Sequence, residues 1–138
     1  MPAQGFMLVH PRLHAPSPKT ALTFLRWTKV HFRDLVLLPA SPGIFTHCLR
    51  NVAPVDDAKY SHTAGKGMSP YFYTIVLDDV HALHSQAYAD VSRKLDLEHT
   101  RALVEGEEAV SSGLGEEAMV WDVVDARFAV FVEEQNGT

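Results

Sequence analysis

A histidine at position 31 lies in the most helix-like segment of the chain, FLRWTKVHFRDLV. Trp27 lies one turn before His31 and Leu35 one turn after it, and Phe24 continues the same apolar stripe. An imidazole has a reference pKa of roughly 6.5, so a buried histidine is a candidate general acid or base. Asp34 is placed either to orient that ring or to lie on the solvated surface. The alternative for His31 is a core histidine bonded to a carbonyl or to a neighbouring side chain.

Two tyrosines, Tyr71 and Tyr73, alternate along the strongest strand pattern, YFYTIVLDD, and therefore share one face. A phenol that points into a cavity can donate a hydrogen bond to a developing enolate or phenolate. Aromatic side chains on a strand can equally fill a core or a dimer interface. The sequence leaves open which face meets the helices, so Phe72 and Thr74 are the alternative pocket pair.

Further polar groups lie on the first two predicted strands. An inward-facing His10 or His47 beside His31 would make a proton relay, although each also suits a structural or exposed position. Arg50 and Arg12 are candidates to clamp a substrate carboxylate through paired hydrogen bonds. Both arginines are also placed to be surface charges at strand ends.

Metal binding is the weaker interpretation of the eight histidines in the chain. His81 and His84 are spaced i, i+3 on a predicted helix, which puts both on one side. Neither His62 nor Asp78 is assured as a third ligand. The sequence contains no HExxH motif, no pair of cysteines, no glycine-rich phosphate loop after a strand and no distinctive haem ligand. We therefore expect no metal and no cofactor.

The composition is that of one ordinary globular domain spanning residues 1–138, with 46% hydrophobic and 21% charged residues. The net charge is −5 and no basic stripe is present, which argues against nucleic acid and anionic membranes as partners. The start of the chain lacks the pattern of a signal peptide, and no apolar run approaches the roughly 20 residues that span a bilayer. A lone Cys48 indicates a reducing compartment, so we expect a cytoplasmic protein.

Four strands and two main helices must position these side chains. Ser17 and Pro18 favour a helix start, Asp79 suits a second cap, and Pro11 predicts weak pairing late in the first strand. The long Gly- and Pro-rich segment 53–70 is expected to be a lid or a connector. Alternation and helical spacing predict strands over 5–13, 43–52, 71–79 and 126–133, helices over 17–38 and 79–96, and a further short helix over 98–113.

The resulting order, β-α-β-β-α-β, predicts an α+β fold of ferredoxin-like topology, with one antiparallel sheet and the helices on one side. The predicted strands are apolar on both faces, and helices can cover only one of them. A second copy of the same sheet is the simplest cover for the other face. We therefore expect a homodimer whose sheets meet face to face.

Four segments resemble the EthD-like proteins of fungi, which belong to the dimeric α+β barrel superfamily. They are FLRWTKVHFRDLV, CLRNVAP, YFYTIVLDDVHAL and WDVVDARFAVFVEE, and the resemblance runs from about residue 5 to residue 133. A histidine at the position of His31 recurs in the family, commonly followed by Ala-Pro, where this chain has Phe32 and Arg33. The resemblance implies a ligand pocket between the curved sheet and the helices.

The same resemblance implies a cofactor-independent lyase, most specifically one that decarboxylates an aromatic polyketide carboxylic acid. Loss of CO₂ leaves negative charge that Tyr73 would stabilise and that His31 would protonate, with His10 as the third expected catalytic residue. The alternatives are a polyketide cyclase, a cofactor-free monooxygenase and a non-catalytic dimer that binds an aromatic ligand. We expect the small hydrophobic substrate to contact Trp27, Phe24, His47, Tyr71, Arg50 and Leu35.

Overall fold

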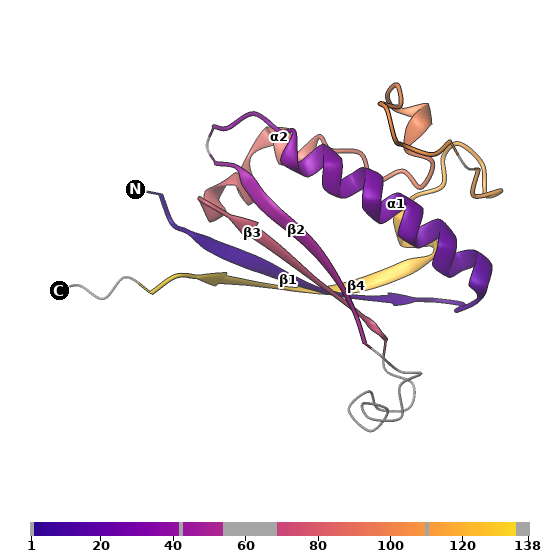
Figure 1. The fold of residues 1–138 in the computed structure, drawn as a ribbon, viewed down its shortest axis with the longest axis horizontal. Helices are drawn as coiled ribbons and strands as arrows, with labels where there is room; N and C mark the ends of the chain where they lie inside the picture. The colour runs from indigo at the N-terminus through magenta and orange to yellow at the C-terminus, as the bar shows by residue number, and fades with distance from the viewer. Residues whose placement is uncertain (1, 42, 54–68, 110, 135–138) are drawn as a thin grey trace.

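A computed structural model describes residues 2–41, 43–53, 69–109 and 111–134 of the chain. The predicted loop and candidate lid at 53–70 falls, over 54–68, outside the described residues, as does His62. Figure 1 shows one long helix lying across a four-stranded sheet. The elements are β1 (Gly5–Leu13), α1 (Pro18–Val36), β2 (Phe45–Val52), β3 (Tyr71–Leu77), η1 (Val80–His84), α2 (Gln86–Ala89), η2 (Leu97–His99), η3 (Val120–Asp122) and β4 (Val124–Val132).

The four strands form one antiparallel sheet in the order β2-β3-β1-β4, which confirms the predicted α+β class and is compatible with a ferredoxin-like fold. All four predicted strands are present within a few residues of their expected bounds. Pro11 interrupts the pairing of β1 with only one of its two neighbouring strands. Pairing of β1 with β3 stops at Val9, but pairing with β4 continues to Leu13, so the predicted weakening applies only to the β3 edge.

Helix α1 forms as the sequence predicts. Ser17 caps it by accepting a hydrogen bond from the Thr20 backbone N–H, Thr20 caps the Ser17 N–H in return, and Pro18 occupies the first turn. The apolar stripe of the helix, including Phe24 and Leu35, is buried against the sheet. The helix therefore holds position 31 over the sheet, as expected.

The prediction of a second helix over residues 79–96 is wrong. The chain instead makes the 3-10 helix η1 and a single turn, α2, and the short helix expected over 98–113 is reduced to η2. Ser85 ends one element and caps the next, because its hydroxyl donates to the Ala82 carbonyl and accepts from the Tyr88 N–H. Serine hydroxyls compete with the helix backbone in this way. Beyond α2 the chain follows an irregular path.

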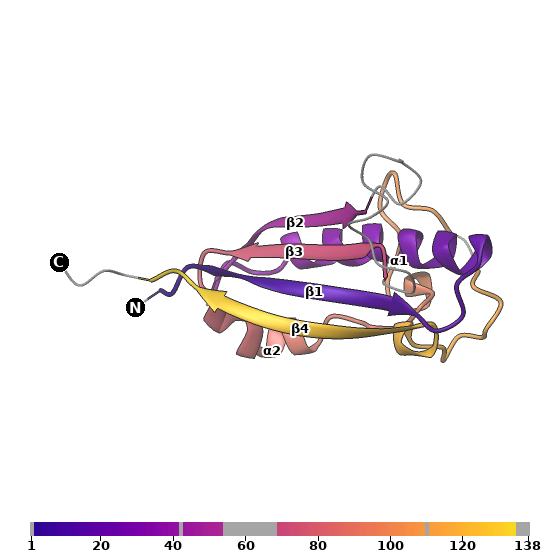
Figure 2. The ribbon, with the colours of Figure 1, turned by 90° about the horizontal axis from the view of Figure 1, so that it is seen from below.

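The two faces of the sheet differ in cover. Met7, Val9, Tyr73 and Ile75 point toward α1 and form the core. Figure 2 views the opposite face, over which no helix of the described residues lies; we call it the open face. Its side chains follow from the strand registers and include Phe6, Leu8, His10, Arg12, His47, Leu49, Phe72, Thr74, Val76, Arg127 and Phe131.

Candidate functional site

A small apolar cavity, with a volume of about 80 Å³, lies between α1 and the sheet. The chain after α2 closes one side of it. Nearly all of its wall is hydrocarbon or aromatic, so a polar group in this wall is exceptional. The lining residues are Met7, Val9, Pro11, Phe24, Trp27, His31, Phe32, Leu35, Tyr73, Ile75, Tyr88, Arg93, Val120, Trp121, Val124, Ala126 and Phe128.

His31 lies in this wall and is 7% exposed. Its ring stacks on Trp27, with the ring centroids 4.4 Å apart and the planes within 15° of parallel. The Nδ1 atom of His31 is buried and has no hydrogen-bond partner among the described residues. Buried polar atoms are almost always paired, so this one is available to a bound molecule.

Burial and, secondarily, the nearby charge of Arg93 lower the pKa of His31 from 6.5 to about 3. Both effects disfavour the imidazolium ion, because it would be desolvated beside another cation. The reference pKa of roughly 6.5 therefore does not apply to this buried ring. At pH 7 the ring is neutral, which makes it a hydrogen-bond acceptor or a general base before it can be an acid.

Tyr73 is the second polar group in the wall that the sequence predicts. It faces α1, so the Tyr71/Tyr73 face meets the helix, while Phe72 and Thr74 lie on the open face. The Tyr73 hydroxyl lies 2.7 Å from Thr28 Oγ1, a buried helix hydroxyl that the sequence analysis missed. Burial raises the pKa of Tyr73. The phenol therefore stays protonated and able to donate a hydrogen bond.

Arg93 is the third polar group and was also missed. On the helix predicted over 79–96 it would lie opposite the apolar stripe, facing solvent. In the irregular chain Arg93 lines the cavity. Its Nη1 donates to the carbonyls of Tyr88, at 3.1 Å, and of Val91, and its guanidinium lies 4.8 Å from the centre of the Tyr88 ring.

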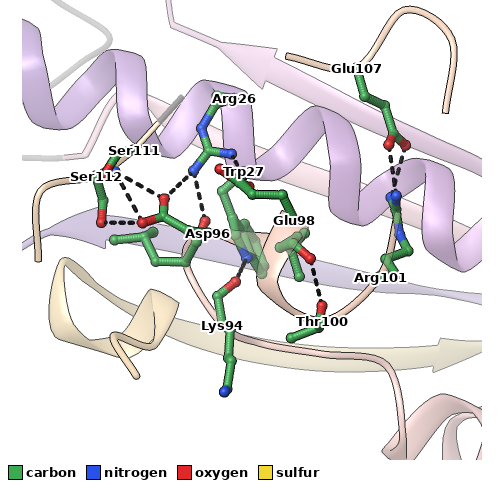
Figure 3. A network of polar contacts seen from close by, with 12 residues as sticks. Arg26, Trp27, Lys94, Asp96, Glu98, Thr100, Arg101, Glu107, Ser111 and Ser112 are labelled. Carbon is green, nitrogen blue, oxygen red and sulfur yellow. Dashed lines mark hydrogen bonds and ion pairs between the residues drawn. The ribbon is translucent and has the colours of Figure 1, made fainter. Parts of the chain in front are cut away.

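Buried polar contacts with α1 fix the chain that carries Arg93 (Figure 3). Arg26 donates from Nη2 to the Leu95 carbonyl at 2.8 Å and to Asp96 Oδ1 at 2.7 Å. Asp96 in turn accepts from the backbone N–H and hydroxyl of Ser112. Trp27 donates from Nε1 to the Lys94 carbonyl at 2.9 Å. These carbonyls are bonded by side chains of α1, which holds the segment in a non-helical path.

Four of the predicted site residues do not lie in the cavity. His10 and His47 lie on the open face, because their positions alternate with the core-facing residues of their strands. The proton relay with His31 is therefore not formed. Tyr71 and Arg50 lie on the α1 side but outside the cavity wall, with the Arg50 guanidinium 4.9 Å from the centre of the Tyr71 ring.

Asp34 and Arg12 also lie outside the cavity wall. Asp34 pairs with Arg101 at 2.6 Å and does not orient the His31 ring. Arg12 is exposed on the open face. The cavity therefore gathers His31, Tyr73, Trp27, Phe24 and Leu35 of the predicted set, and adds Arg93 to them.

The cavity reaches the surface at two aromatic side chains. Trp121 and Phe128 line it and are 45% and 53% exposed. Their rings meet edge to face, with centroids 6.2 Å apart. Trp121 belongs to η3 and Phe128 to β4, the strand that follows it. The mouth is therefore aromatic and suits a flat, apolar group.

Comparison of the chain with protein-family models, with curated proteins and with solved structures gives no significant match. Across the described ranges, no set of three or more His, Cys, Asp or Glu side chains is arranged to hold a metal ion. His81 instead pairs through Nδ1 with Asp79, at 2.6 Å. None of the helices in those same ranges has both the length and the hydropathy needed to cross a bilayer.

Proposed function

We propose that the chain is a cofactor-independent lyase of the EthD-like kind that decarboxylates an aromatic, polyketide-type carboxylic acid. One observation carries the proposal: His31 is buried in an apolar cavity with an unpartnered Nδ1 atom. A histidine kept there for packing alone would be bonded to a carbonyl or a neighbouring side chain. A site for proton transfer to a bound molecule needs that atom free.

His31 is neutral at pH 7 before substrate binds, because its pKa is lowered to about 3. The substrate enters as the carboxylate, the form of a carboxylic acid at pH 7, and its negative charge beside the ring raises the pKa of His31, so the imidazole takes up one proton from water. The carboxylate and the imidazolium stabilise one another, because opposite charges attract strongly where water is excluded. Loss of CO₂ leaves the electron pair of the broken bond on carbon, and the imidazolium gives its proton to that carbon. Imidazole is regenerated, the one proton consumed comes from water, and no oxidant is needed.

Tyr73 supplies a hydrogen bond to the charge that develops on the substrate oxygen. Thr28 lies 2.7 Å from the phenol oxygen and fixes its position. Because one general acid contributes roughly 10²–10⁴-fold to a rate, this oxygen contact and the dry cavity must supply much of the remainder. The apolar wall around Trp27, Phe24 and Leu35 keeps water from the carbanion-like state.

The cavity volume favours a second candidate, a protein that binds an aromatic ligand without turnover. About 80 Å³ is smaller than the ~150 Å³ engineered cavity that holds benzene. The closed part therefore takes a carboxyl group and the edge of one ring, while the rest of a polycyclic ligand lies at the Trp121–Phe128 mouth. Reaction requires the cavity to widen around the ring, whereas binding does not.

We further propose that two chains pair through their open faces to form a dimeric α+β barrel. The open face carries large apolar side chains, among which Phe6, Leu49, Phe72 and Phe131 are 38–50% exposed. Phe6 and Phe131 stack on adjacent strands, with ring centroids 5.3 Å apart. Contiguous exposed aromatic surface of this kind is typical of protein interfaces. The cavity lies on the other side of each sheet and remains open in such a dimer.

The test is CO₂ release from hydroxylated anthraquinone carboxylic acids by the purified protein, with the product recovered from D₂O. The proposal predicts one deuterium at the carbon that lost CO₂. His31→Gln is expected to slow release by at least about 10²-fold, and His84→Gln, a change at an exposed histidine outside the cavity, to leave it unchanged. Binding without release in any variant would favour the second candidate, and uptake of O₂ with turnover would favour a monooxygenase.

A further inference from the structure

The guanidinium of Arg93 is a cation without an acidic partner among the described residues. The carboxylates close to it in sequence are bonded elsewhere: Asp90 accepts from Gln86 at 2.7 Å and Asp96 pairs with Arg26. The two hydrogen bonds that Arg93 makes to described groups both come from Nη1 and go to neutral carbonyls. Within the described part of the chain, its positive charge is therefore not compensated by a carboxylate.

Arg93 is half-buried, so part of its guanidinium faces the apolar cavity instead of water, and a cation in such a place is more stable with an anion beside it. The same wall holds the unpartnered Nδ1 of His31, which is more than nine-tenths buried. One ligand group can pair with both the Arg93 guanidinium and the His31 ring. A carboxylate compensates the guanidinium charge and brings oxygen atoms that accept hydrogen bonds from arginine and from the Nδ1 of His31 once that nitrogen is protonated.

The mouth sets the orientation of such a ligand. Trp121 and Phe128 offer two aromatic surfaces at the exit from the cavity, and Val130 continues the apolar strip along the α1 side of β4, 49% exposed. An apolar ring system lies more favourably against these side chains than in water. The acid group therefore goes in first and the ring system follows.

We propose that Arg93 is the anion-binding residue of this cavity, and that the ligand enters with its carboxylate toward Arg93 and His31 and its rings against Trp121 and Phe128. This inference rests on the proposed function in one respect only, that the cavity is the ligand site. It adds a specificity: acids bind in preference to neutral molecules of the same shape. It requires no turnover.

Both tryptophans of the chain line the cavity, so intrinsic fluorescence reports directly on ligand there. The experiment compares the dissociation constants of anthraquinone-2-carboxylate and anthraquinone-2-carboxamide, which differ in charge and hardly in shape. The proteins are the wild type, Arg93→Gln, Arg93→Lys and Arg127→Gln. Arg127 is an exposed arginine of the open face and serves as the matched control. Circular dichroism spectra verify that each variant is folded.

We expect the wild type to bind the acid about tenfold or more tightly than the amide. Arg93→Gln should abolish this preference by weakening acid binding while leaving amide binding unchanged. Arg93→Lys should keep part of the preference, and Arg127→Gln all of it. The ratio of the two affinities is measured within one protein, so a loss of folding in Arg93→Gln is separated from a loss of recognition.

Equal affinity of the wild type for acid and amide, or binding of neither, would overturn the inference. So would an Arg93→Gln variant that retains the acid preference. An Arg93-dependent preference without any CO₂ release supports the inference and removes the lyase proposal. CO₂ release that does not depend on Arg93 supports the lyase and removes the inference.

Discussion

The rings of Trp27 and His31 stack one helical turn apart, with their centroids 4.4 Å apart. The indole is itself fixed, because its Nε1 donates to the Lys94 carbonyl at 2.9 Å. The imidazole is thus oriented by contact with an aromatic face and not by a hydrogen bond to Nδ1. Orientation without a bonded partner leaves that nitrogen free for a ligand, at a cost in stability.

That cost is measurable by replacing His31 with leucine. An unpaired buried polar atom costs about 1–3 kcal/mol, and leucine has a similar size without that penalty. We expect urea titration at pH 7 to show that His31→Leu is at least as stable as the wild type. Its free energy of unfolding should lie between the wild-type value and a value about 1 kcal/mol higher. Leu35→Ala, a truncation one turn away at a fully buried side chain, should cost about 2–5 kcal/mol. A loss in His31→Leu as large as that in Leu35→Ala would show that His31 is a packing residue.

The pH dependence of stability gives an independent measurement on His31. Its folded pKa, about 3, lies below its unfolded value near 6.5. Between these values the unfolded chain binds a proton that the folded chain does not, so stability falls as pH falls from 6.5, by about 1.4 kcal/mol per pH unit. Above pH 6.5 the contribution is constant.

The comparison with His31→Leu isolates this term. Asp79 and Glu107, whose pKa values are lowered in the folded protein, also reduce stability in acid, but equally in both proteins. From pH 7 to pH 4.5 the wild type should therefore lose about 2–3 kcal/mol more than His31→Leu. Parallel curves would mean that His31 is protonated in the folded protein at pH 4.5.

The position of Arg93 depends on the buried pair between Arg26 and Asp96. Replacing Asp96 with alanine leaves the Arg26 guanidinium 5% exposed and without this carboxylate. Breaking a buried pair in this way costs about 3–5 kcal/mol. Glu117→Ala removes an exposed partner of Lys94 and should cost less than about 1 kcal/mol. Thermal unfolding compares the two, and a small effect of Asp96→Ala would show that the segment is held by other contacts.

The proposed dimer is tested by two neighbouring residues of β4. Phe131 and Val130 are 48% and 49% exposed but lie on opposite faces of the sheet. Phe131→Glu should shift the protein to monomer in sedimentation velocity, because a charge would be buried in the interface. Val130→Glu, at equal exposure on the α1 side, should leave the dimer intact. Dissociation by Val130→Glu alone would place the interface on the other face.

The strands and α1 were predictable because each has a strong local signal: alternation in YFYTIVL, and Ser17 with Pro18 before a periodic stripe. The segment 79–96 was not, because its fate depends on Arg26 and Trp27, distant residues that bond its carbonyls. The spacing of residues within the segment itself carries no information about such distant partners. Arg93 was missed for the same reason.

The alternation of side chains between the two faces of a strand explains the remaining differences between the predicted and the observed site. Alternation groups His10 with Phe6 and Leu8, but it does not say which group meets a helix. Here the group of Met7 and Val9 faces α1, and His10 lies on the open face. The tyrosine pair of β3 faces α1 by the same rule, so Tyr73 reaches the cavity. Only packing against α1 decides between the two faces.

The most direct test of the central claim, that Nδ1 of His31 becomes protonated when a carboxylate binds beside it, is the ¹⁵N NMR spectrum of the His31 ring with and without anthraquinone-2-carboxylic acid at pH 7. His31→Leu assigns its signals. The account predicts a neutral ring in the free protein, with distinct protonated and unprotonated nitrogens, and an imidazolium pattern when the acid is bound. A ring that stays neutral with unshifted signals while the acid saturates the protein would contradict it.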